Sequence, residues 1–237
     1  MRTAFLAAVL SLSCLAQAQF GELLKRANEA LNQHSTAGLS KDKIVAGLKE
    51  ALQVSTRNAV AVTGKPDGFL KNAAIKILLP PKLQRLGNGL RMFGMGARVD
   101  ELEAGMNRAA EQATPEAKQI FIAAVRNMSF DDARKILTGG DTAATEYFKR
   151  ASSDDLTAAF TPIVVQSMER VGVVQQYNRV LAVPGGSALA GQFDLNKYVV
   201  AKTLDGLFLM LGEEEKKIRK NPAAQTTALL KEVFGRK

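Results

Sequence analysis

Helix-start and helix-end signals recur along this chain while strand signals are almost absent, and this pattern constrains the fold more than any other feature. Ser40 stands before the segment Lys41–Thr63 and Gly64 follows it, as an N-cap residue and a C-terminal glycine would. Within this segment apolar residues recur at helical spacing, at positions 44, 45, 48, 52 and 59. The pattern predicts a long amphipathic helix over 41–63.

The same signals predict helices along the rest of the chain. Helices are predicted at about 81–94, 99–113, 173–183, 194–220 and from Asn221 to Gly235. Others are predicted to begin after Thr114, after Ser129, after Asp141 and after Ser153, and the last of these extends to Val171. Ala74–Leu79 is the one short apolar run that could form a strand, and we interpret it as an extended connector because Pro80-Pro81 closes it. We therefore expect an all-α fold: a single globular multi-helix domain of about ten helices over 39–237, without a substantial sheet.

The first eighteen residues have the composition of a secretory signal peptide. Arg2 is their only charged residue, an apolar run from Ala4 to Leu15 follows, and Ala16-Gln17-Ala18 fits an A-x-A cleavage site. The run is too short to anchor the mature chain in a membrane. Residues 1–18 are predicted to be the signal peptide and 19–38 an N-terminal helix and linker, which places the mature protein in the periplasm. A lipoprotein acylated on Cys14 is the alternative, but Ser11 occupies the position where a lipobox has leucine.

Cleavage after Ala18 would remove Cys14, which is the only cysteine, so the mature chain could form no disulfide. Its stability must then come from an apolar core, for which about 220 residues are ample. His34 is the only histidine. We predict no catalytic residue, no cofactor and no metal ligand, because zinc and copper sites rely on histidine and cysteine.

Basic residues are concentrated in one quarter of the chain. Between Lys41 and Arg98 there are eleven Lys or Arg against three acidic residues, whereas from Val99 to the end there are eighteen of each sign. The candidate anion-contacting residues are Lys43, Lys49, Arg57, Lys65, Lys71, Lys76, Lys82, Arg85, Arg91 and Arg98. Phe69 and Phe93 are the only aromatic residues among them, and nucleic acid is not an expected partner of an exported protein. Our leading hypothesis is a non-enzymatic periplasmic protein that binds an anionic or amphiphilic envelope component, a lipid or a polysaccharide, through this basic half.

Two other functions remain open at this point. A hydrolase of envelope polymers would need a pair of carboxylates, for which Glu101, Glu103 and Glu111 are candidates by position alone. A protein-interaction module would instead dock a partner on an apolar helix face. The sequence predicts neither the ligand nor the oligomeric state.

Several long segments resemble a known family of exported proteobacterial proteins, domain of unknown function family 4197. The resemblance extends from about Leu39 to Gly235 and is carried by residues 67–72, 106–111, 143–148, 201–208, 214–224 and 229–235. It implies export and helicity, and it assigns no activity and no site. Ala73 stands where the family tends to have proline, and the loop Pro184–Gly191 is short and glycine-rich.

Overall fold

The computed structural model describes residues 41–182 and 193–221, which form helices and no strand. The helices are α2 (Lys41–Thr63), α3 (Pro81–Met92), α4 (Gly96–Ala113), the 3-10 helix η1 (Thr114–Glu116), α5 (Ala117–Arg126), α6 (Phe130–Thr138), α7 (Ala143–Arg170), α8 (Val173–Leu181) and α9 (Leu195–Lys220). The predicted all-α class is confirmed, but these ranges hold eight α-helices, and the expected number of about ten is wrong. The predicted signal peptide, Cys14, His34, residues 184–191, the helix expected at 19–38 and the helix expected after Asn221 lie outside the described residues.

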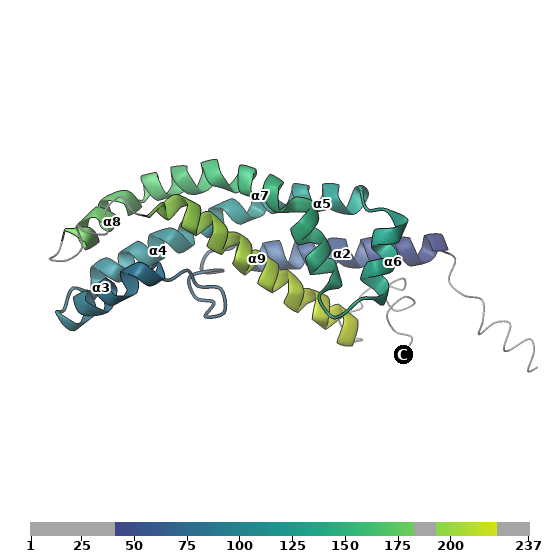
Figure 1. The fold of residues 1–237 in the computed structure, drawn as a ribbon, viewed down its shortest axis with the longest axis horizontal. Helices are drawn as coiled ribbons and strands as arrows, with labels where there is room; N and C mark the ends of the chain where they lie inside the picture. The colour runs from purple at the N-terminus through teal and green to yellow at the C-terminus, as the bar shows by residue number, and fades with distance from the viewer. Residues whose placement is uncertain (1–40, 183–192, 222–237) are drawn as a thin grey trace, which may run out of the picture. The chain divides into compact units, whose positions relative to one another are not determined.

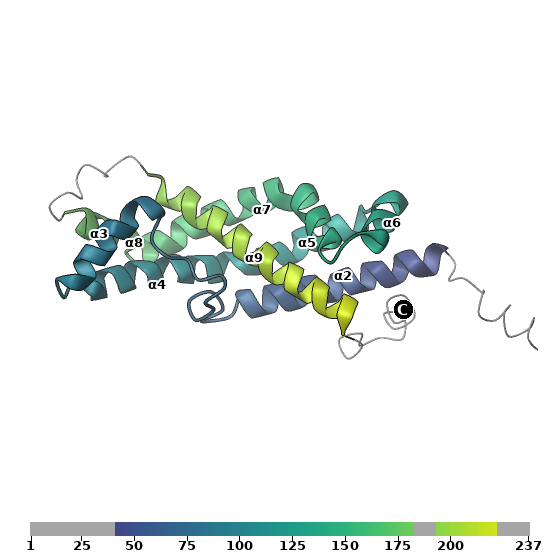
Figure 2. The ribbon, with the colours of Figure 1, turned by 60° about the horizontal axis from the view of Figure 1, so that its bottom comes forward.

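Contacts divide the chain into two units, Met1–Lys43 and Ile44–Lys237, and the described helices belong almost entirely to the second. Within it α7 packs against both α9 and α4, and α3 packs against α4 (Figure 1). Helix α8 also contacts α4, and both views place it at the same end of this unit as α3 (Figure 2). Helices α4, α7 and α9 are therefore the centre of the packing.

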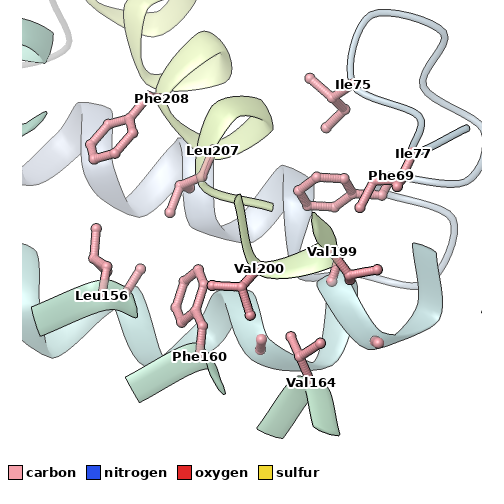
Figure 3. Packing of buried hydrophobic residues seen from close by; sticks show 14 of the residues in the cluster. Phe69, Ile75, Ile77, Leu156, Phe160, Val164, Val199, Val200, Leu207 and Phe208 are labelled. Carbon is pink, nitrogen blue, oxygen red and sulfur yellow. The ribbon is translucent and has the colours of Figure 1, made fainter. Parts of the chain in front are cut away.

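The core lies between α7 and α9 and extends into the connector that joins α2 to α3 (Figure 3). Leu156, Phe160 and Val164 project from α7 at four-residue spacing and are fully buried. Phe121 of α5 meets Phe148 of α7 edge to face, with ring centroids 5.0 Å apart. One continuous cluster of buried apolar side chains thus runs from α2 to α9.

Several helix boundaries follow the signals in the sequence. Helix α2 has the predicted bounds. The Ser129 hydroxyl accepts from the Asp132 N–H, and the Asp132 carboxylate accepts from the Ser129 N–H, so a capping box starts α6. Gly172 takes a left-handed φ of 71° between α7 and α8, and the Asp194 carboxylate accepts from the Lys197 N–H at the start of α9.

Two predicted helix starts are wrong, because their hydroxyl groups bond backward along the chain. Thr114 donates to the Ala110 carbonyl at 2.8 Å, and the chain continues through η1 into α5. Ser153 donates to the Lys149 carbonyl in the same way and lies inside α7, which joins two expected helices into one of 28 residues. A serine or threonine hydroxyl can bond either to the next turn or to the preceding one, and only the first arrangement caps a helix.

The start expected at Asp141 has a different cap from the one predicted. Helix α7 begins at Ala143, and the buried Glu215 carboxylate of α9 accepts from the N–H groups of Ala144 and Thr145, each at 2.9 Å. Asp141 is instead ion-paired with Lys220. A residue 70 positions away in sequence therefore satisfies the first turn of α7.

The connector between α2 and α3 begins with the predicted turn, in which the Gly68 N–H donates to the Lys65 carbonyl. A Cβ at Gly68 would lie 2.4 Å from the Val62 carbonyl oxygen, so the turn requires glycine. Asp67 has a positive φ of 65°. The connector then runs to Pro80 without joining a sheet, as predicted, and Ile75, Ile77 and Leu79 are buried along it.

Candidate functional site

Three buried polar side chains on one face of α4 hold the connector by its backbone. Glu103, Asn107 and Glu111 are spaced four residues apart, so they share that face. Asn107 both accepts from the Ile77 N–H and donates to the Ile77 carbonyl, each at 2.8 Å. Glu103 accepts from the Leu79 N–H at 3.2 Å. These contacts satisfy backbone groups that no sheet partner satisfies.

Glu111 holds the beginning of the same connector. Its carboxylate accepts from the N–H groups of Phe69 and Leu70 at 3.0 and 3.1 Å. Arg108 donates to Glu111 and to Asp67, at 2.7 and 2.6 Å. The hydrogen bonds from Lys71 and from Arg108 lower the pKa of the Asp67 carboxyl. The turn at Lys65–Gly68 is therefore tied to α4 by charge as well as by backbone contacts.

These contacts bear on the carboxylates considered for glycoside hydrolysis. Glu103 and Glu111 are buried, and backbone amides and arginines occupy their oxygens. Glu101 is exposed on the same helix, outside this set. The two buried carboxylates thus have structural roles. No two of the three carboxylates face each other across a cleft.

The ten candidate anion-contacting residues are spread over α2, the connector, α3 and the start of α4. Three of them are engaged in ion pairs. Lys71 contacts Asp67 at 2.7 Å, Lys76 lies 3.9 Å from Glu103, and Arg91 contacts both Asp100 and Glu103 at 2.5 and 3.5 Å. Arg91 therefore links α3 to α4, and much of the charge on the connector is balanced locally.

The other candidates differ in their surroundings. Lys49 is half-buried and donates to the Arg126 carbonyl at 3.4 Å. The side chain of Lys43 lies outside the described residues. Five candidates are exposed and make no ion pair within the described ranges: Arg57, Lys65, Lys82, Arg85 and Arg98.

Three of these five lie on the helix pair α3 and α4: Lys82 and Arg85 in the first half of α3, and Arg98 just after the corner that joins the two helices. No acidic residue occurs in the sequence between Asp67 and Asp100, so this part of the chain carries only positive charge. Lys82 lies in the first turn of α3 and Arg98 in the first turn of α4. A helix dipole disfavours cations at both positions, by about 0.3–1 kcal/mol each. Helix stability therefore does not explain these two residues.

Two open surface cavities flank the end of the connector. One, of about 370 Å³, lies toward α9 and is lined by residues that include Ile75, Tyr198 and Lys202. The other, of about 430 Å³, lies toward α3 and α4, and both share Lys76, Leu78 and Gln84. Tyr198 donates to the Leu78 carbonyl at 3.0 Å, and a hydrogen bond to Asp205 raises the pKa of Lys202. The cavities thus mix exposed apolar side chains with lysines.

The sequence singled out the cations but not the side chains that hold the connector. Asn107 and Glu111 were not recognised as contacts of the connector, because their partners are backbone groups 30 and 42 residues away. The exposure of Met92 at the end of α3 was also missed. A regular four-residue spacing of polar residues on an otherwise apolar face of α4 is the one signal that could have indicated the first two.

In the ranges that the structure describes, no three metal-ligating side chains gather into a cluster. Among those same residues, no helix is both long enough and apolar enough to cross a bilayer.

The fold and the site together define a basic all-α protein in which α4 holds an extended connector, and in which cations without an ion pair in the described ranges lie on α3 and at the start of α4. The chain belongs to the family described as protein of unknown function (DUF4197), whose model matches residues 38–235. No curated protein and no solved structure matches it.

Five of the six segments on which the resemblance rested contact one another in the described part of the chain. Arg108 and Glu111, from the segment 106–111, bind the segment 67–72. Gly206 of the segment 201–208 lies against Phe69, since a Cβ there would be 2.6 Å from its ring. Glu215 of the segment 214–224 binds Ala144 and Thr145. These segments therefore build the fold around the connector and the start of α7.

Proposed function

We propose that this is an exported, non-enzymatic protein that binds an anionic component of the cell envelope through its basic N-terminal half. The observation that supports the proposal most is the placement of Lys82, Arg85 and Arg98. They are exposed, have no ion-pair partner in the described part of the chain, and lie in a stretch without a single acidic residue. Such a surface attracts phosphates, carboxylates and sulfates.

The structure changes which cations the proposal rests on. Lys71 and Lys76 have carboxylate partners, so an incoming anion would have to compete with Asp67 or Glu103 for them. Lys82, Arg85 and Arg98 have no carboxylate partner among the residues that the structure describes, so there an anion would meet no such competition. We therefore assign the main contacts to these three and secondary contacts to Arg57 and Lys65.

The proposal is tested with a triple charge reversal, Lys82→Glu, Arg85→Glu and Arg98→Glu. The matched control reverses Lys118, Arg134 and Arg179, which are exposed on α5, α6 and α8 and change the net charge equally. Binding to vesicles containing phosphatidylglycerol and to dextran sulfate is measured for the mature chain, residues 19–237. Circular dichroism establishes that each variant is folded.

We expect the first triple variant to bind both polyanions at least tenfold more weakly than the wild type, and the control to lose much less. Binding of the wild type should weaken as salt rises, because exposed charges are screened over about 8 Å at physiological ionic strength. Equal losses in the two variants, or binding that does not respond to salt, would contradict the proposal.

A further inference from the structure

The most exposed large apolar side chains in the described part of the chain are neighbours at the α3–α4 corner. Met92 is 87% exposed and Phe93 is 81% exposed, whereas the other exposed apolar residues there range from 38 to 48%. Single exposed apolar residues are ordinary on protein surfaces. Two adjacent ones at a projecting corner, with almost no contact to the fold, call for a separate explanation.

The backbone of this corner is closed, so the exposure does not come from an open loop. Gly94 has a left-handed φ of 73°, its N–H donates to the Arg91 carbonyl, and the Met95 N–H donates to the Leu90 carbonyl at 2.8 Å. This pair of bonds is a Schellman motif, with the half-buried Met95 as its apolar contact. The motif is complete without the side chains of Met92 and Phe93, which it leaves pointing away from the fold.

The cations of α3 lie away from its buried face, as Met92 does. Leu83, Gly87 and Leu90 form that buried face. At 100° per residue, Arg85 and Met92 fall opposite it and Lys82 on its flank, and Phe93 is the C-cap residue that follows the helix. Arg98 follows in the first turn of α4. The exposed side of α3 and the corner therefore combine an apolar tip with positive charge.

We propose that this corner is a membrane-docking wedge whose partner is an anionic lipid bilayer. This inference rests on the proposed function and narrows its anionic component to a lipid surface. Phe93 and Met92 enter the boundary between headgroups and acyl chains, while Lys82, Arg85 and Arg98 contact lipid phosphates. A soluble polyanion would use the charges alone, and the exposed apolar pair is what favours a bilayer.

The first test removes the apolar tip and keeps the charge, by the double substitution Met92→Ser and Phe93→Ser. The control is Val174→Ser with Leu209→Ser, two side chains that are 43% and 45% exposed on α8 and α9. We expect the tip variant to bind phosphatidylglycerol vesicles at least tenfold more weakly than the wild type and to bind dextran sulfate equally well. The control should resemble the wild type with both probes.

A second test reports insertion directly. The chain has no tryptophan, so Phe93→Trp introduces a single fluorescent reporter at the corner. Its emission should shift to shorter wavelength when phosphatidylglycerol vesicles are added, and brominated lipids should quench it. Phe130→Trp, which places the reporter on α6 at the other end of this unit (Figure 1), should show neither effect.

The outcomes separate this inference from the proposed function. A tip variant that binds vesicles as the wild type does, or an indole emission in Phe93→Trp that does not shift, overturns the wedge. If the triple charge reversal still weakens binding in that case, the proposed function stands without it. If the wild type binds neither vesicles nor dextran sulfate at low salt, both are overturned. If the wild type forms a dimer that Phe93→Ser dissociates, the tip is a contact between copies and the wedge is also overturned.

Discussion

At the scale of single residues, Asp67 belongs to a charge network that ties the connector to α4. It contacts Lys71 at 2.7 Å and Arg108 at 2.6 Å, and its backbone has a positive φ that asparagine also tolerates. Replacing Asp67 with asparagine therefore removes the charge while keeping the conformation of the turn.

Asp67→Asn should reduce the dependence of stability on acidic pH. Hydrogen bonds from Lys71 and Arg108 lower the pKa of Asp67 in the folded protein from its ordinary 3.8, so the ionised carboxylate stabilises the fold above that pH. This contribution is lost as pH falls from 3.8 through the lowered folded-state value. The free energy of unfolding, from urea titrations between about pH 2.5 and 7, should differ most between wild type and variant near neutrality and converge in acid.

The control for this measurement is Asp155→Asn, an exposed residue of α7 that makes no ion pair within the described ranges. Its pH profile should follow that of the wild type. A wild-type profile parallel to that of Asp67→Asn down to about pH 2.5 would show that the network does not favour the ionised carboxylate.

Residue-level inference from the sequence was reliable for composition and local turns and failed for contacts made over distance. The surplus of positive charge and the turn at Lys65–Gly68 were recognised. The sequence did not reveal that Lys82 and Lys76 differ. Lys82 has no carboxylate partner in the described structure, whereas Lys76 lies near Glu103. That difference depends on how α4 packs against the connector, and no local pattern encodes it.

At the scale of elements, most helices could be predicted from capping and periodicity, and the wrong boundaries share a cause. Ser129 and Asp194 cap the helices that follow them, whereas Thr114 and Ser153 bond to the preceding turn. Side-chain type alone does not distinguish these two uses. The start of α7 is capped in a third way, by the Glu215 carboxylate of α9.

Glu215→Gln should destabilise the protein by about 2–4 kcal/mol. The carboxylate accepts three hydrogen bonds at the start of α7 and is ion-paired with Arg219 at 2.9 Å, all in a buried setting. A glutamine amide would turn a donor toward groups that need an acceptor, and bonds to buried charged groups are worth about 1.5–3 kcal/mol. Urea unfolding followed by far-UV circular dichroism measures the change.

Glu213→Gln is the matched control on the same helix, because Glu213 makes only an exposed pair with Lys216. It should change stability by no more than about 0.5 kcal/mol. If Glu215→Gln and Glu213→Gln lower the free energy of unfolding equally, the Glu215 carboxylate of α9 is not what stabilises the start of α7.

At the scale of the whole helical unit, one apolar cluster joins all the helices from α2 to α9. The connector takes part in this packing: Phe69 packs against Gly206 of α9, and Ile77 hydrogen-bonds to Asn107 of α4. The connector therefore couples α2 and α3 to the α4, α7 and α9 centre. The sequence predicted the all-α class but not this role of the connector, because its buried backbone groups are satisfied by side chains of α4.

A destabilising substitution in the connector should consequently lower the stability of all these helices together. In Gly68→Ala the added Cβ would lie 2.4 and 2.5 Å from the carbonyl oxygens of Val62 and Thr63, and relieving such overlap costs about 1–3 kcal/mol. Because the core is continuous, we expect one urea transition with an unchanged slope and a lower midpoint. Hydrogen exchange followed by mass spectrometry should show equal loss of protection in peptides from α2–α4 and from α7–α9.

Gly89→Ala, in α3, is the control for that substitution, since a Cβ there meets nothing within 4 Å and alanine favours a helix by up to about 1 kcal/mol. It should leave the transition unchanged or move it to higher urea. Two separate transitions in Gly68→Ala, with protection lost in α2–α4 but kept in α7–α9, would instead show that the connector only links two bodies that fold independently. A single shifted transition, with the control unshifted or more stable, would establish that Phe69, Gly206 and Asn107 couple the basic corner of the protein to its α7–α9 core.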